Sequence, residues 1–316
     1  MDVVTFGETM ALFTPESNGL IKYSSLYSRK FGGAESNVAI GLARLGHKTG
    51  WISKVGNDEL GKGMLAFIRG EGVDVSQVKV VDYAPTGIYL KEVRNQSDVR
   101  VQYYCHGSAA SKLTSTDISD DYLKKSMYLH ITGITPALSE SCYETVLSTI
   151  DKAHDKGIKV IFDPNLRKKL WSEEKARKVL LEIASKADIV LPGVSEGEFL
   201  FGESAIELLG ERFLSLGTKM VIIKDGAEGS YFFNRDQKGF VPAFKVQQVV
   251  DPVGAGDGFA AGFISGLIDE LPLTKALERG NAVGAMVTMV NGDVEGLPDR
   301  DELNQFLKQE NDDVKR

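Results

Sequence analysis

The sequence predicts an α/β fold in which helices flank both faces of a doubly wound, mostly parallel sheet, with a small second β-sheet beside it. Two observations predict this class. Short apolar runs alternate with segments of helical period along the chain, which is typical of β-α-β units. Residues from about 11 to 31 and from about 87 to 105 instead alternate apolar and polar side chains, as half-exposed antiparallel strands do.

The expected parallel strands can be placed in order from their apolar runs. Strands are predicted at 3–6, 49–55, 128–131, 159–162, 188–191 and 220–223, with helical periods at 37–45, 60–71 and 139–156. The runs end in polar or Gly residues, and open α/β sheets bind ligands at the carboxyl ends of their strands. We therefore expect a main domain of residues 1–10, 32–86 and 106–316. Residues 11–31 and 87–105 would form a β lid that excludes water from the site.

Composition bounds the function. The 316 residues are 42% hydrophobic and 26% charged, which is typical of a globular protein. The formal net charge of -7 argues against nucleic acid or an anionic membrane as the main partner. Cys105 and Cys142 show neither metal-ligand spacing nor a disulfide framework, and the sequence has neither a signal-peptide pattern at its start nor a long apolar run. These features predict a cytoplasmic protein.

A glycine-rich turn near the C-terminus is the strongest chemical signal. Residues 251–257 read Asp-Pro-Val-Gly-Ala-Gly-Asp and precede an apolar helical stretch. Backbone N–H groups of Gly254, Ala255 and Gly256, together with the helix dipole, would hold an anion. Asp257 would repel a resting phosphate, but it could take a proton from a substrate hydroxyl while the N–H groups stabilise a transferring phosphoryl group. The turn therefore favours a kinase, against the alternative of an ordinary helix cap.

A second motif identifies the resemblance. Residues 31–39 read Phe-Gly-Gly-Ala-Glu-Ser-Asn-Val-Ala and are followed by Leu-Ala-Arg-Leu-Gly at 42–46. This pattern resembles the N-terminal signature of the ribokinase-like (PfkB) family of carbohydrate kinases, and residues 251–257 resemble the C-terminal signature of the same family. The resemblance covers nearly the whole chain. It implies a ribokinase-like fold and phosphoryl transfer from ATP to a primary alcohol, with Mg²⁺ as cofactor.

The substrate residues follow from the motifs and the resemblance together. Two glycines let the backbone approach a bound sugar, and the Asn side chain after them offers both a donor and an acceptor to hydroxyls. A tight turn with a helix cap is the structural alternative. The predicted substrate-binding residues are Gly32, Gly33, Asn37, Tyr89, Tyr103, Arg167 and Asp257. The two tyrosines are otherwise strand-packing aromatics.

The nucleotide and metal residues rest on the resemblance. Residues 224–229, Lys-Asp-Gly-Ala-Glu-Gly, match a segment that lines the nucleotide site in the family. Glu196 matches a Glu that organises hydrated Mg²⁺, although Gly193 replaces the Asn of that motif. Asp251 resembles a residue that supports a monovalent-cation site in some relatives, with a loop-stabilising carboxylate as the alternative. The predicted cofactor-binding residues are Lys224, Gly226, Gly229, Gly254, Gly256 and Asn281.

Substrate choice within the family remains between two classes. Residues 163–167, Asp-Pro-Asn-Leu-Arg, with Leu170 and Trp171, resemble 2-keto-3-deoxygluconate kinases and some fructokinases. A guanidinium at position 167 can bind a carboxylate or a phosphate through two hydrogen bonds, which a neutral hexose would not require. Residues 101–111 resemble a segment of the 2-keto-3-deoxygluconate kinases, but Cys105 replaces an Arg that is expected to bind the carboxylate. We therefore expect a sugar-acid kinase, with a fructokinase or other ketose kinase as the alternative. A non-catalytic sugar-binding protein is the distant alternative.

Two other assignments are disfavoured by the motifs. Residues 56–62 resemble a phosphate-binding P-loop, but Gly63 stands where its Mg²⁺-binding Ser or Thr belongs. We interpret Asp58 as a turn and helix-cap residue, with sugar binding as the alternative. A nicotinamide dehydrogenase is disfavoured because no Gly-x-Gly-x-x-Gly pattern follows the first strand. Exposed lid strands often pair across a two-fold axis, and together with the family resemblance they predict a homodimer formed through the lids.

Overall fold

The computed structural model, which describes residues 1–17, 19–95 and 98–313, confirms the predicted fold class. Its main sheet has eight strands in the order β14-β13-β12-β11-β10-β9-β1-β4. These strands are β1 (Val3–Phe6), β4 (Thr49–Ile52), β9 (Tyr128–Thr132), β10 (Lys159–Asp163), β11 (Ile189–Val190), β12 (Met220–Lys224), β13 (Gly229–Asn234) and β14 (Lys238–Pro242). The predicted strand at 49–55 divides into β4 and β5 (Lys54–Gly56), and β5 pairs with β6 (Lys79–Val81).

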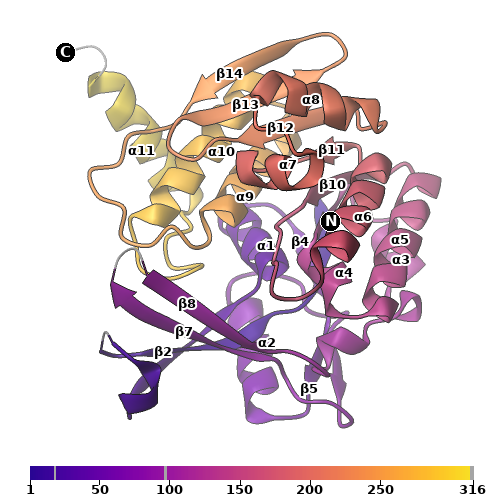
Figure 1. Cartoon of the computed structure of the whole chain (residues 1–316), viewed down its shortest axis with the longest axis vertical. Helices are drawn as coiled ribbons and strands as arrows, with labels where there is room; N and C mark the ends of the chain where they lie inside the picture. Colours follow the sequence, from indigo (N-terminus) through magenta and orange to yellow (C-terminus); the bar gives the residue numbers. More distant parts are fainter. Residues whose placement is uncertain (18, 96–97, 314–316) are drawn as a thin grey trace.

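Helices cover both faces of this sheet (Figure 1). Successive strand residues point to opposite faces, so that Val160 and Phe162 of β10 join one buried cluster while Ile161 joins the other. Helices α5, α6 and α8 pack on the first cluster, and α1, α9 and α10 pack on the second. The helices are α1 (Ala34–Arg44), α2 (Glu59–Gly70), α3 (Asp120–Leu123), α4 (Ile134–Leu138), α5 (Glu140–Asp155), α6 (Glu173–Lys186), α7 (Val194–Phe201), α8 (Ile206–Ser215), α9 (Ala255–Ile268), α10 (Leu273–Thr288) and α11 (Arg300–Asp313).

An antiparallel hairpin completes one edge of the main sheet. Strand β13 pairs antiparallel with β12 and then with β14. The hairpin was not among the strands predicted from the sequence, and β13 reads Gly-Ser-Tyr-Phe-Phe-Asn without a strict alternation of apolar and polar residues. The hairpin buries Phe232 and Phe233 on opposite faces of the sheet, where they join the two main clusters.

The second sheet has four strands in the order β3-β2-β7-β8, and Figure 1 shows it lying apart from the main sheet. Its strands are β2 (Met10–Pro15), β3 (Tyr27–Gly32), β7 (Ile88–Asn95) and β8 (Asp98–Tyr104), so they fall in the two segments singled out from the sequence. Residues 96–97 of the expected lid lie outside the described residues. We refer to these four strands as the lid sheet.

One lid pairing differs from the antiparallel arrangement that the sequence predicts. Strands β2 and β7 run parallel, with Leu12 opposite Tyr89, whereas β2 with β3 and β7 with β8 are antiparallel. Each of the two hairpins enters the lid from the main domain on its first strand. The two entering strands lie side by side in the centre of the sheet, and they therefore run in the same direction.

Polar contacts fix the chain where it enters and leaves the second lid hairpin. Before β7, Asp58 caps α2 through the Gly61 N–H and also accepts hydrogen bonds from the Thr86 N–H and hydroxyl, at 2.9 Å each. The prediction that Asp58 is a helix cap is thus confirmed. The pKa of Asp58 lies below its usual value, since these hydrogen bonds outweigh its burial.

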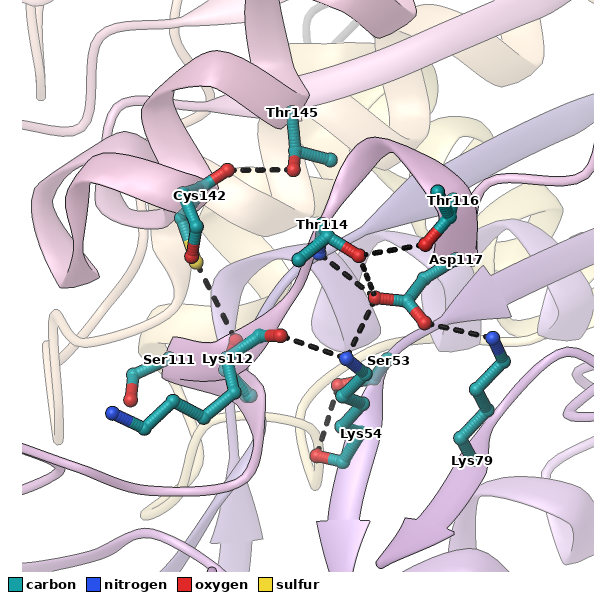
Figure 2. Close-up of polar contacts among 12 residues, drawn as sticks. Ser53, Lys54, Lys79, Ser111, Lys112, Thr114, Thr116, Asp117, Cys142 and Thr145 are labelled. Atoms are coloured by element: carbon teal, nitrogen blue, oxygen red, sulfur yellow. Dashed lines mark hydrogen bonds and ion pairs between the residues drawn. The ribbon is translucent and has the colours of Figure 1, made fainter.

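After β8, a buried ion pair fastens the chain to strand β5 (Figure 2). The Lys54 ammonium lies 2.7 Å from Asp117 Oδ2 and donates to the Lys112 carbonyl. Lys79 contacts the other carboxylate oxygen of Asp117 at 2.8 Å, and Thr114 donates to Asp117 from its backbone and its hydroxyl. This network ties residues 112–117 to two neighbouring strands. Among the described residues, no helix is both long and apolar enough to cross a membrane.

Candidate active site

A cavity of about 420 Å³ lies where the strands of the main sheet end and the lid sheet begins. Strand β10 contributes Asp163 at its carboxyl end, and β12 contributes Lys224. Parallel strands present their carboxyl ends at one edge of the sheet, so polar residues distant in sequence meet there. The predicted residues that line the cavity are Gly32, Gly33, Asn37, Tyr89, Tyr103, Arg167, Glu196, Lys224, Gly254, Gly256 and Asp257.

The glycine-rich turn forms the start of helix α9, as predicted. Gly254 is its N-cap and has a φ of 84°, a left-handed conformation that favours glycine. A Cβ at Gly254 would lie 2.7 Å from the Asp293 carbonyl oxygen, so the turn also needs glycine to pack. Ala255 and Gly256 follow in the first turn of the helix, where backbone N–H groups have no intrahelical partner. The geometry is that of an anion-binding helix N-terminus.

Asp257 lies in that first turn and is held from two sides. The Asn37 side-chain amide donates to Asp257 Oδ2 at 2.8 Å, and the Asn165 amide lies 3.4 Å from Oδ1. The carboxylate is buried, with 8% of the residue exposed. Burial raises the pKa of Asp257 to about 7, although the hydrogen bond from Asn37 works in the opposite direction. A carboxyl group with this pKa can accept a proton near neutral pH.

A half-buried lysine supplies the positive charge at the same cavity. The Lys224 ammonium lies 2.6 Å from Asp163 Oδ2. A Cβ at Gly256 would lie 3.7 Å from the same Lys224 nitrogen, so the ammonium is close to the glycine-rich turn. Burial acts to lower the pKa of Lys224, but the charges of Asp163 and Glu196 outweigh burial and raise it. Lys224 is therefore charged and lies beside the anion-binding turn, and its role toward phosphate stays a prediction.

Glu196 is more constrained than the sequence suggested. Its Oε2 accepts a hydrogen bond from the Gly193 N–H and its Oε1 accepts one from the Leu166 N–H, both at 2.8 Å. Burial raises the pKa of Glu196, with Asp163 adding to the effect. Each carboxylate oxygen keeps a second lone pair. Glu196 and Asp163 thus offer oxygen atoms on one wall of the cavity, which suits a hydrated Mg²⁺ that arrives with a nucleotide.

The lid sheet supplies the other wall. The Tyr89 and Tyr103 rings lie 6.0 Å apart between ring centres on neighbouring strands, and the Tyr89 hydroxyl donates to Asp293 Oδ2 at 3.0 Å. Gly32 must be small, since a Cβ there would lie 2.4 Å from the Tyr89 hydroxyl oxygen. Arg167 is exposed on the loop after β10, and its backbone carbonyl accepts from the Leu170 N–H. Within the described part of the chain, its side chain makes no hydrogen bond or ion pair. Its guanidinium is therefore available to a ligand.

Three predicted nucleotide residues do not line this cavity. Gly226 lies in the turn between β12 and β13 and Gly229 is the first residue of β13, with φ values of 53° and 138°. Gly229 is needed for packing, because a Cβ there would lie 2.3 Å from the Val241 carbonyl oxygen. Asn281 lies in α10 and donates from its amide to the carbonyls of Val241 and Pro242, at 3.0 Å each. These contacts hold the end of β14, and a nucleotide role for the three residues stays a prediction.

Asp251 has contacts that do not fit a monovalent-cation site. Its Oδ2 lies 2.5 Å from the Lys91 ammonium of the lid strand β7. Its Oδ1 accepts a hydrogen bond from the Val253 N–H at 3.1 Å. An ammonium already neutralises this carboxylate, so a cation would compete with a covalently tethered charge. The alternative of a loop-stabilising carboxylate, also raised from the sequence, agrees with the Val253 contact.

Four residues that the structure brings to the site were not predicted from the sequence: Asn165, Asp163, Lys91 and Asp293. Asn165 has a φ of 34°, which is uncommon for a residue other than glycine, and this conformation brings its amide to Asp257. The run Asp-Pro-Asn after a predicted strand is the signal that could have identified Asp163 and Asn165. The sequence offers no comparable signal for Lys91 or Asp293, since only folding brings the lid to these loops.

The fold and the site together define a phosphotransferase. A buried carboxylate lies in the first turn of a helix whose N-terminal N–H groups have no intrahelical partner, and a charged lysine lies beside that turn. The chain belongs to the pfkB family of carbohydrate kinases, whose family model matches residues 1–300.

Individual relatives agree with this family. A 2-dehydro-3-deoxygluconokinase of Bacillus subtilis (strain 168) is 44% identical over 97% of this chain and 95% of its own length. A PfkB protein from Polaromonas sp. JS666 is similar in structure, with a TM-score of 0.88 and 42% identity over 96% of this chain and 99% of its own. A ribokinase II structure from E. coli, solved with ATP and Mg²⁺, has a TM-score of 0.91 at 26% identity over 98% and 99% of the two chains.

Proposed function

We propose that the protein phosphorylates 2-keto-3-deoxygluconate, also named 2-dehydro-3-deoxygluconate, at its terminal hydroxyl with ATP to give 2-keto-3-deoxy-6-phosphogluconate. The observation that carries the proposal is one cavity that holds both an unpaired guanidinium, Arg167, and a buried carboxyl of pKa about 7, Asp257. A sugar acid presents a carboxylate to the first and a hydroxyl to the second. The similarity to the Bacillus subtilis kinase supports the same substrate.

The chemistry assigns one role to each group. Asp257 removes the proton from the terminal hydroxyl, whose oxygen forms a bond to the γ-phosphorus while the bond to the β-γ bridging oxygen breaks and ADP leaves. The N–H groups of Ala255, Gly256 and Asp257 stabilise the charge on the transferring group. Lys224 adds a positive charge on the same side. Asn37 and Asn165 orient the Asp257 carboxylate toward the hydroxyl.

Magnesium would arrive with the nucleotide. Bound Mg²⁺ neutralises charge on the β- and γ-phosphate oxygens. Glu196 and Asp163 would hold its water ligands, because Mg²⁺ keeps several waters and uses few protein carboxylates. Within the described part of the chain, no group of three or more His, Cys, Asp or Glu side chains forms a metal site of its own.

The test is ADP release with MgATP and a panel of 2-keto-3-deoxygluconate, fructose and ribose. We expect the highest kcat/KM with the keto-deoxy acid. Arg167→Met should raise the KM for that acid by roughly 10- to 100-fold while changing kcat much less, since a charge-assisted contact to carboxylate contributes about 1.5–3 kcal/mol. Lys168→Met, an exposed neighbour paired with Glu173, is the control. A preference for fructose, unaffected by Arg167→Met, would contradict the proposal.

A ketose kinase is the second candidate, and Cys105 favours it. The Cys105 thiol lines the cavity where related sugar-acid kinases are expected to carry an Arg. Burial raises the pKa of this thiol to about 12, so it remains uncharged and offers a carboxylate no positive charge. Cys105→Arg separates the two candidates. It should lower the KM for the sugar acid if acids are the substrates, and it should only impair a ketose kinase.

We also propose a homodimer formed through the lid sheets. Tyr23 is 77% exposed and Leu26 is 64% exposed beside the edge strand β3, where a second lid could cover them. Light scattering at micromolar concentration tests this assembly, and Leu26→Glu should shift a dimer to monomer. A cytoplasmic location is consistent with ATP as phosphoryl donor and with both cysteines free, and fractionation of cells would test it.

A further inference from the structure

We propose that the Lys91 ammonium, which the lid sheet carries, supplies the positive charge beside the glycine-rich turn at residues 251–257. This kinase therefore works without a bound monovalent cation. The Lys91 side chain extends from strand β7 to Asp251, the residue that opens the segment leading to Gly254 and Asp257. Lys91 is thus a positioning residue, because it acts on the turn through Asp251 and contacts no reacting atom.

The ion pair between Lys91 and Asp251 is buried, and the loss of either charge would therefore disturb the turn. Lys91 is 4% exposed and Asp251 is 7% exposed, and their charged atoms lie 2.5 Å apart. Water screens such a pair little, so removing one charge leaves the other without solvation. The Asp251 carboxylate in turn fixes the local backbone, since its Oδ1 accepts from the Val253 N–H directly before Gly254. The charge on Lys91 therefore bears on the shape of the turn.

The charge of the same ammonium also acts on a second acidic residue, Asp293. Asp293 is 6% exposed, its Oδ1 has no hydrogen-bond partner among the described residues, and its carbonyl oxygen packs against Gly254. Burial raises the pKa of Asp293, whereas the Lys91 charge opposes that rise. The Lys91 ammonium therefore acts on two buried acidic residues behind the turn, through direct contact with Asp251 and through its charge on Asp293.

The lid strands connect the Lys91 ammonium to the wall of the cavity that the lid sheet supplies. Tyr89, two residues before Lys91 on the same strand face, donates to Asp293. Lys30 of strand β3 donates to the Asn291 carbonyl and pairs with Glu295 at 2.9 Å, at a partly exposed position. A soluble cation would bind regardless of the lid, whereas Lys91 reaches Asp251 only from the lid sheet. The turn and the lid are therefore held in one arrangement.

The experiment compares the wild type with Lys91→Met in choline chloride and in potassium chloride at equal ionic strength. Thermal unfolding and kcat with MgATP and whichever sugar is turned over are both measured. The wild type should change by less than about twofold in kcat between the salts, because its cation is covalent. In choline, the kcat of Lys91→Met should be about 10²-fold lower than that of the wild type. Potassium or ammonium should raise the kcat of the variant by at least about tenfold and should also raise the unfolding temperature of the variant.

Two controls separate this role from general damage to the fold. Lys30→Met removes the other lid lysine that contacts the same loop, and it should show no response specific to potassium. Lys91→Met combined with Asp251→Asn replaces the pair with neutral groups, so it should fold in choline and lose the potassium response. The unfolding measurements need no substrate, and they decide the proposal even if the sugar assignment fails.

Two results would overturn the proposal. One is a wild-type enzyme that potassium stimulates more than about tenfold over choline, since its turn would then depend on a soluble cation. The other is a Lys91→Met variant with wild-type kcat and stability in choline, because the turn would then need no cation at that position.

Discussion

The Asn37 side-chain amide donates a 2.8 Å hydrogen bond to Oδ2 of Asp257, across 220 residues of sequence. The same amide group accepts from the Gly33 N–H through its oxygen, at 3.4 Å. The Asn37 side chain therefore connects the glycine pair Gly32-Gly33 to the Asp257 carboxylate at the start of α9. The two sequence motifs of the family form a single structural unit, and the orientation of the Asp257 carboxylate depends on both.

Removal of the Asp257 charge is expected to abolish most of the chemistry. Asp257→Asn keeps the size of the side chain and can still contact Asn37, but it cannot accept the hydroxyl proton. We expect kcat to fall by about 10²–10⁴ with no loss of thermal stability. Single-turnover phosphorylation measures the chemical step directly. Asp236→Asn, an exposed turn residue, is the matched control, and near-normal turnover by Asp257→Asn would remove it from the role of base.

The pKa of Asp257 predicts the acid limb of the pH profile. The carboxyl must be deprotonated to act as a base, and burial raises its pKa to about 7 in the free protein. We therefore expect kcat/KM to rise tenfold per pH unit below about pH 7 and to level off above it. Asn37→Ala removes the hydrogen bond that favours the charged form, so the midpoint should move to higher pH. A midpoint near pH 4 would contradict this assignment.

The sequence predicted the main sheet better than the lid, for a physical reason. Buried parallel strands such as β10 and β12 are continuous apolar runs that end at polar residues, and this pattern is visible in one dimension. The parallel pairing of β2 with β7 is decided by where two distant hairpins enter the lid. Local alternation carries no information about that choice.

The site shows the same division. Glycine and carboxylate positions within one motif, such as Gly254 and Asp257, could be predicted because the turn itself creates the anion site. Lys91 and Asp293 could not be predicted, since each acquires its role from a contact with a residue far along the chain. Their sequence neighbourhoods are those of an ordinary strand and an ordinary loop.

The buried ion pair of Figure 2 predicts a large stability effect without a catalytic one. Lys54→Met leaves the Asp117 carboxylate buried without its 2.7 Å partner, so we expect a loss of about 3–5 kcal/mol in the free energy of unfolding. Lys79→Met removes the second partner of the same carboxylate, but the Lys79 side chain is 53% exposed and its loss should stay within about 1 kcal/mol. Urea denaturation measures both. Equal losses would show that burial does not govern this cluster.

Removal of the Lys224 charge should affect catalysis more than sugar binding. Lys224→Met takes positive charge from beside the anion-binding turn and leaves Asp163 buried without its 2.6 Å partner. We expect kcat to fall by about 10²-fold, with a smaller change in the KM for the sugar. Lys219→Met, whose side chain is 78% exposed on the preceding loop, is the control. A rise in sugar KM with unchanged kcat would place Lys224 in substrate binding instead.

A buried carboxyl behind the lid predicts a pH dependence of stability. Glu8 is 2% exposed, its Oε2 has no hydrogen-bond partner among the described residues, and burial raises its pKa from about 4.5 to about 8. Between these values the folded protein retains a proton that the unfolded chain has released, so stability falls as the pH rises through this window and levels off above about pH 8.

The Glu8→Gln variant tests this effect, because a Gln side chain is uncharged at every pH and the variant lacks this loss of stability. The free energy of unfolding of Glu8→Gln minus that of the wild type should therefore increase by on the order of 2–5 kcal/mol from pH 5 to pH 8.5. Urea denaturation at both pH values measures the difference, with the exposed Glu16→Gln as control. A constant difference between Glu8→Gln and the wild type would show that Glu8 is already ionised in the folded protein at pH 5.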